Sequence, residues 1–182
     1  MKKYEFTGET KRVELWNRTA TLHRIKATVE FGFVKVGELG GWIEKEENLS
    51  HEGKAWVWGN AKVCGNAKVC GDAEVWGNAK VWGNAEVCGD AKVWGNANVC
   101  GNAEVFLASH VLVMGSVGSR NDFTTFFRDK DNEITVKCGC FLGKIDKFLE
   151  KVTQTHGNNK YALVYRAAVE VAKLQIELTE RK

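Results

Sequence analysis

The segment Gly118-Ser119-Arg120-Asn121-Asp122 carries residue types that are well suited to binding an anion. Backbone amides of a Gly/Ser turn, together with one guanidinium group, can surround a negatively charged group. The segment does not have the spacing of a phosphate-binding P-loop. The alternative interpretation is a connecting turn, in which Asn121 and Asp122 hydrogen-bond to their own backbone.

Three side chains farther along the chain are candidates to complete such a site. His156 precedes Gly157, and this segment is also typical of a helix terminator. Tyr161 and Tyr165 are most simply core residues with exposed hydroxyls, although their rings could also stack on a base. We predict one ligand site from both segments. Its members are Ser119, Arg120, Asn121, Asp122, His156, Tyr161 and Tyr165.

The sequence does not indicate metal chemistry. Cys138 and Cys140 form a C-x-C that a strand would place on one face, and two thiols alone are an incomplete zinc set. They could join the ligand site if the C-terminal segments fold back on one another. At the corners of the repeat only Asp72 and Asp90 are acidic, which disfavours calcium. We predict no metal, no cofactor and no catalytic residue.

A six-residue repeat runs without a gap from Ala55 to Val117 and must form the body that positions these side chains. Valine returns at every sixth position, alanine stands two residues before most of the valines, and Gly-Asn or Gly-Asp follows in most copies. Ala-x-Val alternates as a strand does, and Gly-Asn suits the positive φ of a corner. Each hexapeptide is therefore predicted to form one strand and one turn. Three of them would close an 18-residue coil with Ala and Val inside, giving about three and a half coils.

The V-x-G-N-A-x pattern resembles the hexapeptide-repeat proteins, whose left-handed β-helix occurs in acyltransferases and in polymer-forming phage and bacterial proteins. The left-handed winding is implied by the resemblance alone. The six-residue period does not determine the handedness, and parallel crossovers are otherwise right-handed. The flanking segments are similar to a phage and prophage family of uncharacterised hexapeptide-repeat proteins. Those segments read GELGGWIEKEENLSHEGKAWVWGNA, GSRNDFTTFF, VKCGCFLGKIDKF and THGNNKY.

The resemblance to acyltransferases makes His110 a candidate general base, because those enzymes use a histidine near a subunit interface. However, His110 takes an outward position that Trp56, Glu74 and Lys92 occupy in earlier coils, and no acidic partner is identifiable. The coil also lacks the extruded loop that often helps to build an acyl-coenzyme site. A surface role for His110 is therefore favoured over catalysis.

The outward position after valine forms a column on one face of the solenoid, because residues 18 apart lie above one another. A stack of indoles in water requires a cover. We predict an oligomer interface on this column, and the resemblance favours a homotrimer. Packing of the column under the C-terminal helices is the alternative. The column consists of Trp58, Trp76, Trp94 and Leu112.

The composition excludes several classes of protein. The 26 basic and 23 acidic residues are mixed along the chain, which disfavours broad nucleic-acid binding. The N-terminus has no apolar signal-peptide stretch and no window approaches a membrane span, so we expect a cytoplasmic protein, in the host cytoplasm if a phage encodes it. Cysteine and tryptophan share one repeat position, which predicts packing sites rather than disulfides. The cysteines concerned are Cys64, Cys70, Cys88 and Cys100.

These patterns predict a mainly β protein in three parts. Residues 1–54 are expected to form a β cap, residues 55–117 the left-handed parallel β-helix, and residues 118–182 a β-hairpin followed by two helices. The hairpin strands are expected at Phe123–Arg128 and Glu133–Cys138, and the apolar spacing after them indicates an amphipathic helix pair.

The leading functional hypothesis is a non-enzymatic phage protein that sequesters a small anionic, nucleotide-like signal of host antiviral defence. The pocket is expected between subunits or beside the C-terminal part. The hypothesis rests on the resemblance, on the lack of a recognisable catalytic constellation and on the Ser119-Arg120 turn. Two alternatives stay open. One is acyl transfer from a coenzyme A thioester with His110 or His156 as base, and the other is a structural scaffold that assembles through the tryptophan column.

Overall fold

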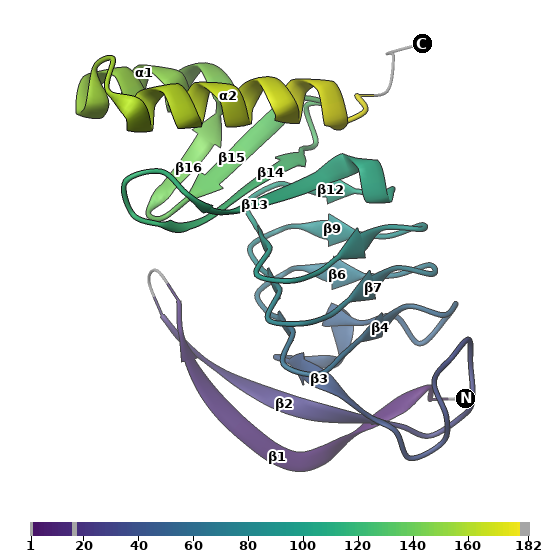
Figure 1. The fold of residues 1–182 in the computed structure, drawn as a ribbon. Coiled ribbons are helices and arrows are strands. Elements are labelled where there is room, and N and C mark those ends of the chain that lie inside the picture. The colour runs from purple at the N-terminus through teal and green to yellow at the C-terminus, as the bar shows by residue number, and fades with distance from the viewer. Residues whose placement is uncertain (1, 16–17, 179–182) are drawn as a thin grey trace.

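The computed structural model describes residues 2–15 and 18–178. Each hexapeptide forms a two-residue strand and a glycine turn, and together they build a solenoid of about four turns (Figure 1). Gly71 shows why the corner needs glycine: its φ is 65°, and a Cβ there would lie 2.8 Å from the backbone nitrogen of Gly89 in the next coil. The strands are β4 (Trp56–Val57), β5 (Lys62–Val63), β6 (Lys68–Val69), β7 (Glu74–Val75), β8 (Lys80–Val81), β9 (Glu86–Val87), β10 (Lys92–Val93), β11 (Asn98–Val99) and β12 (Glu104–Val105).

Three parallel sheets form the sides of the solenoid, with neighbouring strands one coil apart in the sequence. They run β4-β7-β10, β5-β8-β11 and β6-β9-β12, the second of which continues into the N-terminal strands. The repeat valines from Val57 to Val105 are fully buried, and the alanines from Ala55 to Ala103 are at most 1% exposed. The predicted three-hexapeptide coil with Ala and Val inside is therefore confirmed.

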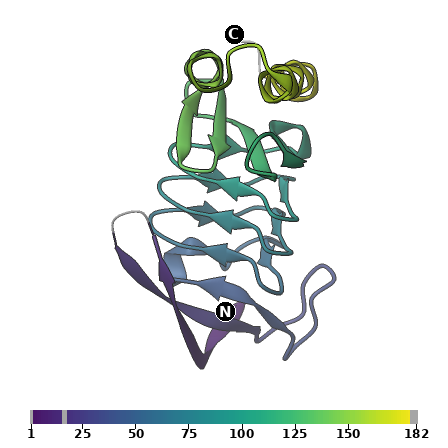
Figure 2. The same ribbon diagram turned by 60° about the vertical axis from the view of Figure 1, so that its left-hand side comes forward.

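The N-terminal part is a curved antiparallel sheet that joins the solenoid directly (Figures 1 and 2). Strands β1 (Tyr4–Glu14), β2 (Thr19–Ala27) and β3 (Leu39–Ile43) pair in that order, and a short 3₁₀ helix, η1 (Glu46–Asn48), follows. Strand β3 pairs in parallel with β5, and Leu49 forms a parallel bridge with Val69. The parallel rows thus extend back before the first hexapeptide.

Trp56 was expected to point outward but is only 1% exposed. Its indole packs against the rings of Tyr4 and Phe31, with ring centroids 6.2 Å and 5.4 Å away. The expectation was wrong because the N-terminal segments cover the first coil at this position. Trp56 belongs to the solenoid core.

The C-terminal part is a four-stranded antiparallel sheet with two helices on one face. The predicted hairpin is confirmed and forms the two central strands of the sheet. The last repeat valines, Val111 and Val117, lie in the antiparallel sheet and not in the solenoid rows. The elements are η2 (Ala108–His110), β13 (Val111–Val117), β14 (Asp122–Arg128), β15 (Ile134–Cys138), β16 (Phe141–Lys144), α1 (Ile145–His156) and α2 (Lys160–Gln175).

The three tryptophans of the column lie outside the surface that the C-terminal helices cover, whereas Leu112 does not. Trp76 and Trp94 stack with ring centroids 6.3 Å apart, and Trp94 is 59% exposed. Trp58 meets the edge of Trp56, whereas Leu112 packs against the core beneath the helices. Packing of the column under the helices, the alternative from the sequence, is therefore wrong for the tryptophans and holds only for Leu112, because the helices pack on the antiparallel sheet.

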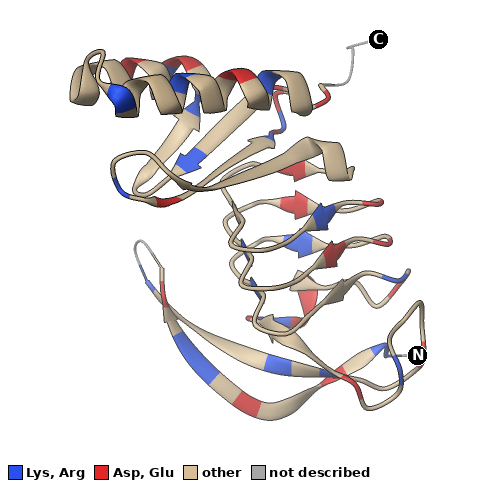
Figure 3. Cartoon of the chain, in the orientation of Figure 1, with Lys and Arg blue, Asp and Glu red and all other residues tan. Residues whose placement is uncertain are grey.

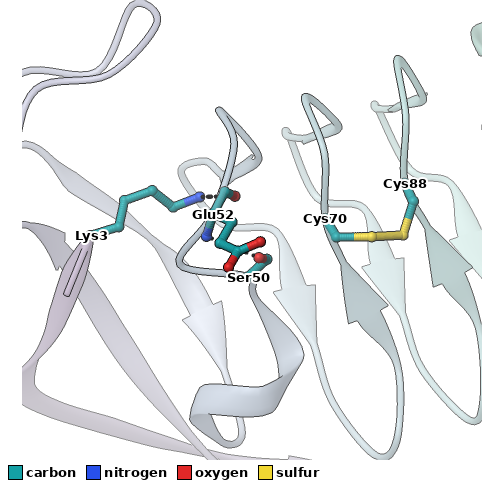
Figure 4. The surroundings of a disulfide bond; sticks show 5 residues. All are labelled: Lys3, Ser50, Glu52, Cys70 and Cys88. Carbon is teal, nitrogen blue, oxygen red and sulfur yellow. Dashed lines mark hydrogen bonds between the residues drawn. A yellow bond between two sulfur atoms is a disulfide. The ribbon is translucent and has the colours of Figure 1, made fainter. Parts of the chain in front are cut away.

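A disulfide joins neighbouring coils between Cys70 and Cys88 (Figure 4). These two cysteines are 18 residues apart, which places them on adjacent rungs with Cα atoms 4.5 Å apart. The prediction of packing sites without disulfides is wrong for this pair. It is confirmed for Cys64 and Cys100, which are buried free thiols on another face.

Candidate functional site

A pocket of about 540 Å³ lies between the C-terminal sheet and α1 and α2. Four of the seven predicted ligand residues line it: Ser119, Arg120, His156 and Tyr165. They come from the turn after β13, the last residue of α1 and the second turn of α2. The fold therefore brings together three segments that are separate in the sequence.

His156 connects the turn to both helices. Its Nε2 lies 3.3 Å from the hydroxyl of Ser119, and its ring stacks on Tyr165 with centroids 5.8 Å apart. Gly118 makes this approach possible, because a Cβ there would lie 2.0 Å from Cζ of Tyr165. Gly118 also has a φ of 74°, which favours glycine. The Ser119 hydroxyl and the imidazole are thereby fixed at the pocket wall.

Arg120 lies across the turn between β15 and β16. A Cβ on Gly139 would be 2.9 Å from Nη1 of Arg120, so the absence of a side chain at Gly139 allows the guanidinium to lie on the backbone. Among the described residues, no carboxylate pairs with Arg120. The charge of Arg120 is therefore available to a ligand.

The pocket combines a basic rim with an apolar floor. Lys151 joins Arg120 and His156 at the rim, while Phe141 and Phe148 contribute aromatic surface, with their ring centroids 5.3 Å apart. Of the described residues that line the pocket, none is acidic. This distribution suits a ligand that is anionic at one end and apolar at the other.

The thiols of Cys138 and Cys140 also line this pocket. This was expected from the sequence for the case that the C-terminal segments fold back on one another. Cys140 is exposed, and Cys138 accepts a hydrogen bond of 3.3 Å from the hydroxyl of Thr124. Burial, together with the nearby Cys138, raises the pKa of Tyr165, so its hydroxyl stays protonated at neutral pH and can donate. No group of three or more His, Cys, Asp or Glu in the described ranges could hold a metal.

Three predicted ligand residues do not line the pocket. The backbone nitrogen of Asn121 donates to the carbonyl of Gly118, and Asp122 accepts from the backbone nitrogen of Phe123. Asn121 and Asp122 therefore belong to a connecting turn with local hydrogen bonds, which was the alternative interpretation of this segment. Tyr161 contacts the His156 ring from outside the pocket, with centroids 5.9 Å apart. The sequence had no signal for Lys151, Phe141 and Phe148 as pocket residues, because their helix and strand patterns indicated only packing or solvent exposure.

His110 is buried, with 3% of its surface exposed, and not outward as its repeat position suggested. Its Nδ1 accepts a hydrogen bond from the backbone nitrogen of Phe106. Burial first, and then the positive charge of Arg128, lower the pKa of His110. The surface interpretation of His110 is therefore wrong, and the ring closes the end of the solenoid.

A scan against models of known protein families and a search of curated proteins found no match for this chain. None of the helices in the described part of the chain is long and apolar enough to cross a membrane. Function is therefore inferred from the residues of the pocket.

Proposed function

We propose that the protein is a non-enzymatic binding protein whose C-terminal pocket takes a small anionic ligand with an aromatic or apolar part. One observation carries the proposal: a rim of Arg120, Lys151 and His156 stands over the aromatic floor without a lining carboxylate. The pocket volume of about 540 Å³ is in the range of small-molecule sites.

The chemistry of the rim favours a nucleotide-like ligand. A phosphate can accept from the guanidinium of Arg120 and from the Ser119 hydroxyl, while a base packs on Phe141. Ser119 and His156 also form a pair of the kind that hydrolases use, in which a carboxylate orients the histidine. Within the described residues no carboxylate contacts His156, which favours binding over hydrolysis.

The resemblance to phage and prophage hexapeptide-repeat proteins extends the proposal. It supports a left-handed winding of the solenoid, a phage origin and sequestration of a nucleotide signal of host antiviral defence in the host cytoplasm. The stack of half-buried Trp76 on exposed Trp94 supports a homotrimer that buries this column. Burial of His110 gives no support to acyl transfer at that residue.

Calorimetric titration with cyclic and ADP-ribose-type nucleotides tests the proposal. At least one nucleotide is expected to bind to the wild type, and Arg120→Gln should weaken that binding by about tenfold or more, because a charge-assisted hydrogen bond is lost. Arg12→Gln, an exposed change on β1, is the matched control and should bind like the wild type. Failure of every nucleotide to bind, or equal binding by Arg120→Gln, would contradict the proposal.

A further inference from the structure

The three faces of the solenoid differ in the charge of the residue before each valine. On one face Glu74 pairs with Lys92 across a rung, and on another Lys68 pairs with Glu86. On the third face Lys62 lies directly opposite Lys80 in the parallel pair β5 and β8. Figure 3 shows the mixture of charges along the solenoid strands. Glu86 also lies opposite Glu104 on the second face, where Arg128 pairs with Glu104. The third face is therefore the one among the described rungs that places two positive charges side by side.

Opposed like charges destabilise a sheet unless something compensates for them. Burial and the neighbouring Lys80 lower the pKa of Lys62. In the described part of the chain neither lysine pairs with a carboxylate. The fold therefore retains uncompensated positive charge at this position, as a binding site for an anion does.

A groove runs along this face. A cavity of about 200 Å³ and one of about 520 Å³ share four lining residues and therefore adjoin each other. The shared residues are Lys62, Lys80, Asn98 and Lys137. The hairpin β1-β2 and the C-terminal sheet project from the same side of the solenoid (Figure 1). Residues of the hairpin line the smaller cavity, and residues of the C-terminal sheet line the larger one.

The two ends of the groove differ in chemistry. Val13 and Leu22 from the hairpin and Trp82 from the solenoid line the smaller, apolar end. The indole nitrogen of Trp82 donates to Asn98 at 2.7 Å, which fixes the ring. The side chains of Asn78 and Asn96 line only the larger end.

One carboxylate lines each cavity, and within the described residues neither forms an ion pair with Lys62, Lys80 or Lys137. Glu14 lines only the smaller cavity and accepts from the hydroxyl of Thr19. Asp122 lines only the larger cavity and accepts from the backbone of Phe123. The three lysines therefore keep their positive charge unpaired by these two carboxylates.

We propose that this groove is a second ligand site, which binds a small molecule carrying at least two phosphate groups next to an aromatic or apolar part. Lys62, Lys80 and Lys137 hold the phosphates, and the surface of Trp82 holds the apolar part. The groove shares no lining residue with the C-terminal pocket, although Gly139 of the larger cavity lies beneath the Arg120 guanidinium.

Calorimetric titration with inorganic pyrophosphate and with ADP tests the groove. Both are expected to bind, and Lys80→Gln should weaken binding by about tenfold. Lys92→Gln on another face is the matched control and should leave binding unchanged. Lys151→Gln changes a residue that lines only the C-terminal pocket and should leave pyrophosphate binding to the groove unchanged. The loss of binding at one site can therefore be told apart from the loss of binding at the other. Equal binding by Lys80→Gln and Lys92→Gln, or no binding of either probe, would overturn the proposal.

A measurement without ligand gives a second test. Lys80→Gln removes the repulsion from Lys62 and should raise the melting temperature by about 1–3 °C, whereas Lys92→Gln removes an attraction to Glu74 and should not raise it. A lower melting temperature of Lys80→Gln would contradict the inference that Lys80 and Lys62 repel each other without compensation. Binding of a single-stranded oligonucleotide without binding of pyrophosphate would overturn the small-molecule class.

Discussion

The repeat body and the segments that flank it are held together by different kinds of contact. In the body, one rule places every Ala and Val inside, and each coil contacts copies of itself. In the flanks, each contact is made once: His156 with Ser119, Arg120 with Gly139, and Tyr4 with Trp56. Regularity gives a scaffold that the sequence shows plainly, whereas both candidate sites use residues from the flanks.

The largest expected effect tests the rule inside the body. Val87→Asp places a carboxylate in the fully buried column and should destabilise the fold by about 4 kcal/mol or more, because no partner can compensate for the charge. Glu86→Asp at the adjacent exposed position is the control and should change stability by less than about 0.5 kcal/mol. Denaturant unfolding measures both changes. Similar stability of the two variants would break the distinction between the inward and outward positions.

A smaller effect is expected from the covalent link between coils. Cys70→Ser should lower the free energy of unfolding by about 3 kcal/mol, the size expected for a loop of this length. Cys138→Ser changes a free thiol in the C-terminal part and is the control. Before reduction, the denatured wild type should show the four free thiols Cys64, Cys100, Cys138 and Cys140. Six reactive thiols would show that the coils are not linked.

The smallest effect concerns a contact made once in the N-terminal flank. The ammonium of Lys3 is buried and donates to the carbonyl of Ala55 at 2.8 Å, and burial lowers the pKa of Lys3 to about 8. Above that pH the unfolded chain holds more protons than the folded one, so this residue should make stability rise by about 1 kcal/mol between about pH 7 and pH 9.

Denaturant unfolding of the wild type and of Lys3→Met across this pH window measures the contribution of Lys3. Because the other titrating groups are common to both proteins, their effects cancel in the difference. The wild type should gain stability relative to Lys3→Met as the pH rises. An unchanged difference would show that the Lys3 ammonium is as well solvated in the folded protein as in the unfolded chain.

The sequence predicts an element well where the pattern is local or periodic. The strand-turn hexapeptide, the hairpin at β14 and β15, and the amphipathic spacing of α1 were all visible in this way. The pocket members Ser119, Arg120, His156 and Tyr165 were suggested by residue type, but only the fold shows that they meet.

The errors arise where a flank covers the body. Trp56 and His110 follow the outward rule of the repeat, yet the N-terminal strands bury Trp56, and His110 folds back at the last coil. The spacing of Cys70 and Cys88 did indicate a disulfide, because 18 residues equal one coil. We predicted packing sites instead, because tryptophan occupies the same repeat position in other copies. The position of Lys62 opposite Lys80 could also have been predicted, because the two lysines are one coil apart in the sequence.

The two ends of the solenoid are closed by the chain itself. At one end β3 pairs with β5 and Leu49 bridges to Val69. At the other, Ala103 bridges to Asp129, and the backbone of Lys130 donates to Asn102. Ladder groups that would template a further coil are thereby occupied at these positions, whereas the row β4-β7-β10 ends without a further strand among the described residues. The chain itself therefore limits the length of the rod at these capped positions, and end-to-end addition of another copy would find few free ladder groups there.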